Sequence, residues 1–307
     1  MKQWLIRAAV AAATVLAPGA ALACACGCDV FDVGGTPTVI SGSGGSVSLQ
    51  YGVMDQNHNM SGTRSSPDSA NEDKQVRSNF VVAGVQYMFN RDWGVMVDIP
   101  FTNRLFRTED GGPPVTSADH TALGDIRLTG VYTGLSPDMS TGLIAGVKLP
   151  TGDWKYAGFD RDTAIGSGST DIVLGGYHVG SLSQNRAWGY FVQGQFDLPV
   201  ATQGGYHPGD EFHGALGVSY KAWESGTGRM TLSPVLQMVG SVRTVDGGPE
   251  ANPEGSGYSR ILISPGVQFN TGPWKLYGDV EFPVYQDVNG QQLVASQLFK
   301  LQVSRRF

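Results

Sequence analysis

Residues 297–307 of the chain read QLFKLQVSRRF, and this stretch decides the fold. Apolar side chains stand at every second place, at Phe299, Leu301 and Val303. The run ends on the aromatic Phe307. Successive side chains of a β-strand point to opposite faces, so these residues share one apolar face. Chain ends are usually loose unless a strand is held in a sheet, and the pattern therefore predicts a terminal strand paired in a sheet.

The same alternation recurs along the chain from residue 46 onward. Segments of ten to sixteen residues, rich in Val, Tyr, Phe, Leu and Gly, are separated by clusters of residues that favour turns. The apolar period of two and the many glycines argue against amphipathic helices. Twelve strands are predicted, near 46–57, 74–89, 93–106, 122–135, 141–152, 168–181, 187–200, 211–223, 229–244, 258–269, 274–287 and 293–307.

The connections between these segments alternate in length, except for a short DVNG at 287–290 where a long one is expected. An up-and-down meander with tight turns at one end is typical of bacterial outer-membrane barrels. The predicted fold is all-β, a transmembrane antiparallel up-and-down β-barrel of about 12 strands over 46–307, with both chain ends periplasmic. Long loops are predicted at 58–73, 107–121, 153–167, 201–210 and 245–257, and short turns at 90–92, 136–140, 182–186, 224–228 and 270–273.

Tryptophan supplies a feature tied to a bilayer. Trp93, Trp188, Trp223 and Trp274 each adjoin a short turn, whereas Trp154 lies in a long loop. Amphipathic aromatic rings are favoured at the headgroup level, so the four turn tryptophans are predicted to form a membrane-interface girdle facing outer-membrane lipid.

Alternation also predicts which side chains face the barrel interior. In GDIRLTGVYTG, Asp125 and Arg127 oppose the apolar Ile126 and Leu128. A charge facing lipid near the midplane costs ~2–4 kcal/mol, so the charged face is assigned to the lumen. These residues form either a structural ion network or a selectivity filter. The predicted lumenal residues are Asp125, Arg127, Lys148, Asp171, Gln193, Gln195, Asp197, Lys275, Asp279 and Glu281.

The terminal strand has a role in this plan. A barrel closes its last strand onto its first, so that no edge is left unpaired in hydrocarbon. The outward face of the closing strand is then Phe299, Leu301, Val303 and Phe307. This face resembles the C-terminal signal that the barrel-insertion machinery of bacteria reads, although Arg305 departs from that pattern.

The beginning of the chain has a different character. Residues 1–23 carry Lys2 and Arg7 before an apolar run that ends in Ala-Leu-Ala, which predicts a secretory signal peptide removed before Cys24. Residues 24–45 are predicted to be a cysteine-containing segment that either hangs in the periplasm or plugs the lumen. The formal net charge of -6 argues against a nucleic-acid partner.

The three cysteines, Cys24, Cys26 and Cys28, are spaced by two. An extended chain turns such side chains to one side, and thiolates are the ligands that Cu(I) prefers. A Cu(I) site is therefore one hypothesis. A disulfide between Cys24 and Cys28, or lipid attachment at Cys24, are the alternatives, and no other cofactor is predicted.

No catalytic motif is found in the sequence. The chain contains no His-x-Ser and no Gly-x-Ser-x-Gly, and its five histidines are scattered. The chain is therefore not expected to be an enzyme.

Three glycine-rich stretches carry a family resemblance. They are LGDIRLTGVY at 123–132, GLIAGVKLPTGDW at 142–154 and IGSGSTDIVLGGYHVG at 165–180. With them the chain resembles the family called MetA-pathway of phenol degradation, over roughly 75–307. The resemblance implies an outer-membrane channel for uptake of small, often aromatic, compounds.

These observations lead to one expected function and two alternatives. The expected function is passive passage of small solutes, including aromatic or hydrophobic compounds, through a narrow or partly plugged pore. One alternative is a metal-binding or redox-responsive envelope protein anchored by the barrel. The other is a structural or adhesive barrel that acts through its long loops.

Overall fold

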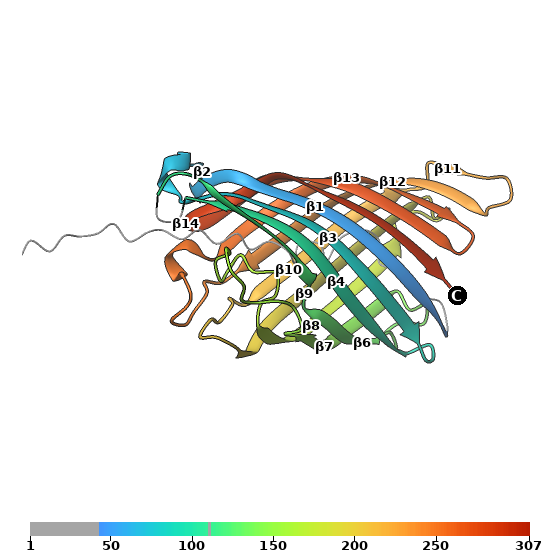
Figure 1. The fold of residues 1–307 in the computed structure, drawn as a ribbon. Coiled ribbons are helices and arrows are strands. Elements are labelled where there is room, and N and C mark those ends of the chain that lie inside the picture. Colours follow the sequence, from blue (N-terminus) through green and yellow to red (C-terminus); the bar gives the residue numbers. More distant parts are fainter. Residues whose placement is uncertain (1–42, 110–111) are drawn as a thin grey trace, which may run out of the picture.

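The computed structural model describes residues 43–109 and 112–307, which form a closed antiparallel β-barrel (Figure 1). Among these residues, no helix is long and apolar enough to cross a membrane. The elements are β1 (Gly44–Gly62), β2 (Arg64–Ser65), η2 (Asp68–Ala70), β3 (Asp73–Met88), β4 (Trp93–Thr108), β5 (Thr116–Leu123), β6 (Ile126–Tyr132), β7 (Thr141–Leu149), β8 (Ser169–Ser181), β9 (Trp188–Thr202), β10 (Glu211–Tyr220), β11 (Trp223–Glu224), β12 (Met230–Arg243), η3 (Pro253–Gly255), β13 (Tyr258–Thr271) and β14 (Trp274–Arg306).

The ring of strands runs β1, β3, β4, β6, β7, β8, β9, β10, β12, β13 and β14, and then returns to β1. The element β14 is a hairpin that turns at Gly290, whose φ is 65°. One arm pairs with β13 and the other with β1, and the Arg306 N–H donates back to the Pro273 carbonyl at 2.9 Å. With its two arms counted separately, the wall of the barrel has twelve strands, which confirms the predicted fold class.

The terminal strand closes the barrel as predicted. Its last residue, Phe307, exchanges backbone hydrogen bonds of 2.9 and 3.0 Å with Gly45, just ahead of the paired Ser46 and Arg306. The ring of Phe307 covers Gly45, where any Cβ would collide with it. A side chain at this closing contact would require the ring to move, and the aromatic ring shields the exposed backbone.

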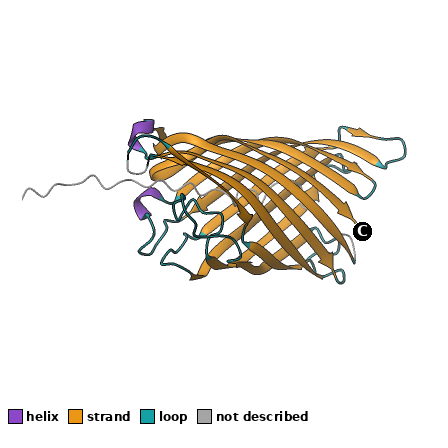
Figure 2. Cartoon of the chain, viewed as in Figure 1, coloured by secondary structure: helices purple, strands orange, loops and turns teal. Residues whose placement is uncertain are grey.

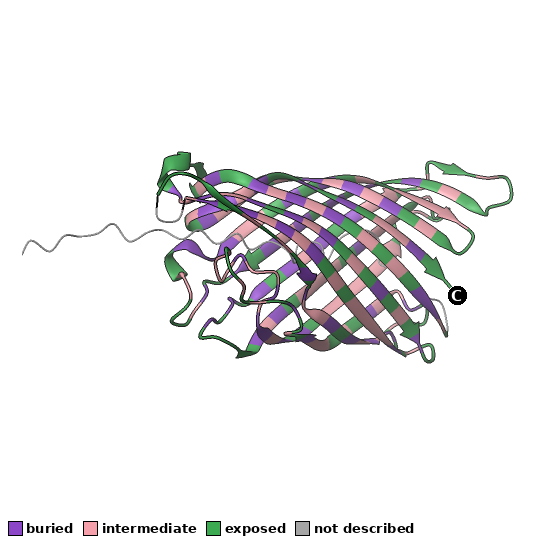
Figure 3. Ribbon diagram, in the orientation of Figure 1, coloured by how far each residue is buried: buried purple, intermediate pink, exposed green. Residues whose placement is uncertain are grey.

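Burial alternates along the strands, which Figure 3 shows as a chequered wall. On β9, Val192 and Phe196 are exposed on the outside, whereas Asp197 is buried on the inside. The exposed positions of the wall are mainly Val, Leu, Ile, Phe and Tyr. An outward apolar face with a polar inward alternation is the pattern of a barrel surrounded by lipid.

One predicted strand, 122–135, is wrong as a single unit. It is split at Gly124 and Asp125 into β5 and β6, because the two parts pair with different lengths of β4. The C-terminal part of β4 extends beyond the end of β6 and pairs with β5 there. Among the described strands, β5 pairs only with β4. Asp125 therefore lies between the two strands, and its carboxylate binds a neighbouring loop.

The two ends of the barrel differ. The longer loops and both 3-10 helices gather at the end opposite the C-terminus (Figure 2). The strands begin or end at tight turns on the C-terminal side (Figure 1). We refer to these as the loop end and the turn end.

Candidate functional site

The inward side chains of β6 to β10 carry a layer of charge near the loop end. The charged layer consists of Arg127, Lys148, Asp171, Asp197 and His213, all of them buried. Its members face one another because Arg127 is opposite Lys148 in the ladder, and Lys148 is opposite Asp171. Four of these five residues were predicted to be lumenal, Arg127 and Asp197 from the alternation and Lys148 and Asp171 from the glycine-rich stretches.

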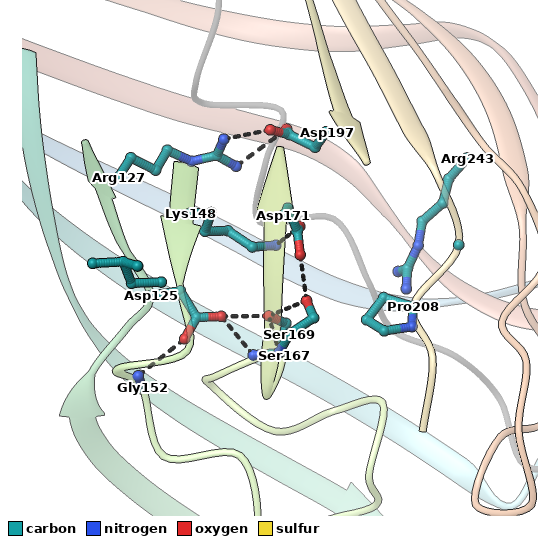
Figure 4. A network of polar contacts seen from close by, with 12 residues as sticks. Asp125, Arg127, Lys148, Gly152, Ser167, Ser169, Asp171, Asp197, Pro208 and Arg243 are labelled. Carbon is teal, nitrogen blue, oxygen red and sulfur yellow. Dashed lines mark hydrogen bonds and ion pairs between the residues drawn. The ribbon is translucent and has the colours of Figure 1, made fainter. Parts of the chain in front are cut away.

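Two ion pairs hold the charged layer together (Figure 4). Arg127 donates to both carboxylate oxygens of Asp197, at 2.7 and 3.2 Å, in the bidentate geometry that strengthens such pairs. His213 Nε2 lies 3.3 Å from the same carboxylate. Lys148 pairs with Asp171, which also accepts a 2.6 Å hydrogen bond from Ser169.

Asp125, also predicted to be lumenal, lies between β5 and β6. It lines the edge of the interior but is engaged with the loop after β7, accepting from Gly152 N at 2.9 Å and from Ser167 N at 2.7 Å. The backbones of Gly152 and Gly166 touch there, since a Cβ on Gly166 would lie 2.5 Å from the Gly152 carbonyl. Asp125 thus ties together the two ends of residues 150–168, the inner loop.

The inner loop packs on the barrel interior. Arg104 on β4 donates to the carbonyls of Thr163 and Ala164 at 2.8 and 2.9 Å. The ring of Phe159 lies 5.6 Å from that of Phe106, centroid to centroid. Sequence reasoning missed Arg104, although its place between the inward Thr102 and Phe106 was a signal that it faces the interior.

Aromatic stacking fixes the outer part of the inner loop. The ring of Tyr156 stacks on His120 of β5 at 3.9 Å between centroids. His120 Nε2 also lies 3.0 Å from the carboxylate of Asp153. These contacts, with those of Arg104, hold the inner loop against β4 and β5.

A cavity of about 150 Å³ lies between the inner loop and the charged layer. Its apolar lining includes Phe80, Pro100 and Ile165, and its polar lining includes the two ion pairs described above. A dry cavity of about this volume can hold a single benzene ring. The cavity is therefore large enough for a small aromatic molecule.

Beside the charged layer the interior becomes apolar. On β9, Phe191 lies nearer the turn end than Asp197, and on β10 Ala215 lies nearer the turn end than His213. The predicted polar lumen is wrong here, because several inward positions are apolar as well as the outward ones. The apolar belt consists of Met54, Phe80, Phe191, Ala215, Val235, Val239, Leu262, Tyr277, Ala295 and Leu298.

Two further predicted acids, Asp279 and Glu281, lie on β14 beside the apolar belt. Asp279 accepts hydrogen bonds from Gln237, Ser264 and Tyr277 at 2.6 to 2.9 Å. Glu281 accepts from Lys300 at 3.2 Å. These acids form a second buried group, separate from the charged layer.

The remaining predicted lumenal residues play lesser parts in the structure. Gln195 lies 3.1 Å from His213, and joins the charged layer. Gln193 and Lys275 are half-buried on the inward positions of β9 and β14. The predicted residues thus divide among the charged layer, the inner loop and β14, and they do not form one ring.

The four turn tryptophans lie where the sequence placed them, exposed at the first residues of β4, β9, β11 and β14. Trp93 and Trp188 each pack on a neighbouring tyrosine. The guanidinium of Arg305 lies over Trp274 at 5.5 Å from the ring centroid. Their contact with lipid headgroups stays a prediction, as does the reading of Phe299, Leu301, Val303 and Phe307 by the insertion machinery.

The predicted signal peptide and Cys24, Cys26 and Cys28 lie outside the described residues. The Cu(I) hypothesis therefore stays a prediction. Within residues 43–109 and 112–307, no group of three or more His, Cys, Asp or Glu side chains is placed to hold a metal ion.

Known proteins provide three comparisons. The family model described as MetA-pathway of phenol degradation matches residues 55–294. The fold is similar to the COG4313 outer membrane channel from Pseudomonas putida F1, with a TM-score of 0.64 and 12% identity over 88% of this chain and 97% of that one. It is also similar to the β domain of the Bordetella autotransporter BrkA, with a TM-score of 0.53 and 13% identity over 86% of this chain and 100% of that one. No curated protein sequence matches this chain.

Proposed function

This chain belongs to the family described as MetA-pathway of phenol degradation, and on that premise we propose that it is an outer-membrane channel for small amphipathic solutes. The observation that carries this proposal is the presence of two environments side by side in the barrel interior. A charged layer with a cavity lies on β6 to β10, and an apolar belt, which shares Phe80 with the lining of the cavity, lies mainly on β12 to β14, β1 and β3.

This arrangement suits a solute with an apolar body and a polar group. Such a solute can place its polar group among the ion pairs of the charged layer, where water is already partly excluded. Its apolar body is then favoured by the belt, because burial of apolar surface contributes about 25 cal/mol per Å². A fully hydrated sugar gains nothing from the belt, and a hydrophobic constriction opposes its passage.

The comparison with the Pseudomonas putida protein supports the proposal, since that protein is described as an outer membrane channel. We also propose that the turn end faces the periplasm, because outer-membrane barrels have short periplasmic turns and longer external loops. The turn tryptophans would then meet the inner leaflet of the outer membrane.

We assign no catalytic role to the described residues. Thr141 Oγ1 lies 2.8 Å from His178 Nδ1, and the Tyr190 hydroxyl lies 3.0 Å from His178 Nε2. This group lies on the outward face of β7 and β8, away from the cavity.

Proteoliposome swelling tests the proposed function. Liposomes that contain the protein are diluted into phenylalanine or into arabinose, two solutes of similar size that cross lipid slowly. We expect phenylalanine to enter faster than arabinose, and both to enter faster than into protein-free liposomes. Swelling rates equal to those of protein-free liposomes for both solutes would contradict a channel, and a preference for arabinose would contradict the role of the belt.

A further inference from the structure

Asp98 on β4 is an acid that lines the cavity but belongs to neither ion pair of the charged layer. It occupies an inward position, as do the other even-numbered residues of this part of β4. In the ladder Asp98 is opposite Arg127, Arg127 is opposite Lys148, and Lys148 is opposite Asp171. Asp98 therefore extends the row of inward charges by one strand, toward β3.

The carboxylate of Asp98 has no partner in the part of the chain that the structure describes. No hydrogen bond and no ion pair joins it to another residue among 43–109 and 112–307. Arg127, across the ladder, directs two of its nitrogens to Asp197. Lys148 pairs with Asp171, so each of these two cations already has a carboxylate. Asp98 is a third carboxylate in the same row, and neither cation forms an ion pair with it.

A hydroxyl group approaches Asp98 above Gly84. Because Gly84 has no side chain, the inward groups of the two neighbouring strands can lean over it. A Cβ at Gly84 would lie 2.9 Å from Asp98 Oδ1 and would collide with the hydroxyl of Ser48 on β1. Within the described ranges, the Ser48 hydroxyl also has no hydrogen-bond partner. Both side chains are half-buried, so their oxygens are not sealed inside the protein.

We propose that Asp98 and Ser48 form a subsite for the ammonium group of small alkyl amines at the edge of the cavity. This inference rests on the proposed function, because it names the polar group that a favoured solute would carry. An ammonium group is the matching ligand, since it is a compact positive charge with three N–H donors. Ca²⁺ is a poor match, because it takes six to eight oxygen ligands and these two side chains supply only three.

The surroundings of Asp98 favour an alkyl body on that ammonium group. The same two strands contribute Phe80, Val82 and Pro100 to the lining of the cavity, and the inner loop contributes Ile165. Burial of an alkyl chain against such a lining is favourable. A cavity of about 150 Å³ can hold a body of the size of benzene, and a butyl chain is smaller. A butylammonium ion can therefore use both the carboxylate and the apolar lining.

Titration of the full-length protein in micelles of a non-ionic detergent, followed by saturation-transfer NMR of the ligand, tests this subsite. The ligands are butylamine, which is protonated at neutral pH, its uncharged counterpart butanol, and the anion butyrate. Micelles without protein give the background for each ligand. We expect saturable binding of butylamine that is tighter than that of either comparator. Asp98→Asn keeps the shape but removes the charge, and should weaken butylamine binding by about 10- to 100-fold while leaving butanol binding unchanged.

Two further variants keep the test decisive. Ser48→Ala removes a neutral acceptor and should weaken butylamine binding by about 2- to 10-fold. Asp119→Asn makes the same exchange as Asp98→Asn at an exposed acid on the outward side of β5, and should bind butylamine as the wild type does. Should Asp98→Asn fail to fold, Ser48→Ala and the three ligands on the wild type still decide the matter.

Butylamine binding that is unchanged in Asp98→Asn and Ser48→Ala would overturn the subsite, as would equal affinity of the wild type for butylamine and butanol. An equal loss of butanol binding in Asp98→Asn would also overturn it, because the loss would then not depend on charge. Failure of the channel is a separate result. If the wild type takes up neither phenylalanine nor arabinose, the proposed function fails whatever butylamine does. If it takes up both and butylamine binding does not depend on Asp98, only the subsite is wrong.

Discussion

The charged layer and the apolar belt line the same interior but are built in different ways. In the charged layer, side chains from distant strands satisfy one another in pairs, as Arg127 on β6 does with Asp197 on β9. In the belt, side chains such as Val239 and Leu262 pack without polar partners. The first region therefore depends on each partner being present, whereas the second depends on filled volume.

The largest expected effect comes from breaking an ion pair of the charged layer. Asp197→Ala removes the buried carboxylate that Arg127 binds at both oxygens, which should lower the free energy of unfolding by about 3–5 kcal/mol. Urea unfolding in detergent measures the change. Lys221→Ala, at an exposed ion pair with Glu224, is the control and should cost no more than about 1 kcal/mol. Equal changes in the free energy of unfolding for the two variants would contradict the prediction that the buried ion pair stabilises the protein more than the exposed one.

The next effect comes from emptying part of the belt. Leu262 is 0% exposed in the interior, and its neighbour Ile263 is 42% exposed on the outside. Leu262→Ala should lower the free energy of unfolding by about 2–5 kcal/mol and should widen the path, so that phenylalanine uptake rises. Ile263→Ala is the matched control, with a smaller change in stability and unchanged uptake. A larger cost at Ile263 would mean that the two faces have been assigned the wrong way round.

Release of the inner loop should have an intermediate effect. Asp125→Ala removes the acceptor that joins Gly152 to Ser167, and hydrogen bonds to charged groups contribute about 1.5–3 kcal/mol each. We expect trypsin to cut after Lys155 faster in this variant than in the wild type. Asp119→Ala, on the outward side of β5, should leave the cleavage rate unchanged. Identical rates for all three proteins would show that Asp125 does not hold the loop.

The smallest effect is expected at the turn end, outside both interior regions. Arg305→Ala removes the cation that lies over Trp274, an exposed contact that contributes about 0.5–1 kcal/mol. Thermal unfolding in lipid nanodiscs should show a correspondingly small shift, similar to that of Arg229→Ala at another short turn. A shift as large as that of Asp197→Ala would contradict this prediction, because the exposed contact would then stabilise the protein as much as a buried ion pair does.

Much of the fold follows from the sequence because a barrel wall imposes a simple period of two. The closing strand, Arg127 and Asp197 were predicted from that alternation. The turn tryptophans were predicted from their place beside short connections, and Lys148 and Asp171 from the glycine-rich stretches. The split of β5 from β6 did not, because it depends on how far β4 rises beside each of them. No local sequence pattern near Gly124 indicates how far β4 extends beyond β6.

The apolar belt was missed for a related reason. On β12, the inward Val235 and Val239 alternate with the outward Leu236 and Met238, so both faces are apolar at that level. Alternation cannot then separate lumen from lipid. The pairing of Arg127 with Asp197 was also beyond the sequence, since the partners are 70 residues apart and meet only after the barrel closes.

The central claim is that solutes pass through the belt inside the barrel, and neighbouring residues on β10 test it most directly. Ala215 is 5% exposed in the belt, whereas Leu216 is 52% exposed on the outside. Phenylalanine uptake into proteoliposomes is measured for Ala215→Trp and Leu216→Trp. We predict that Ala215→Trp lowers uptake toward the protein-free rate, while Leu216→Trp leaves it unchanged. Wild-type uptake in Ala215→Trp, with the variant folded and inserted, would contradict a path through the belt.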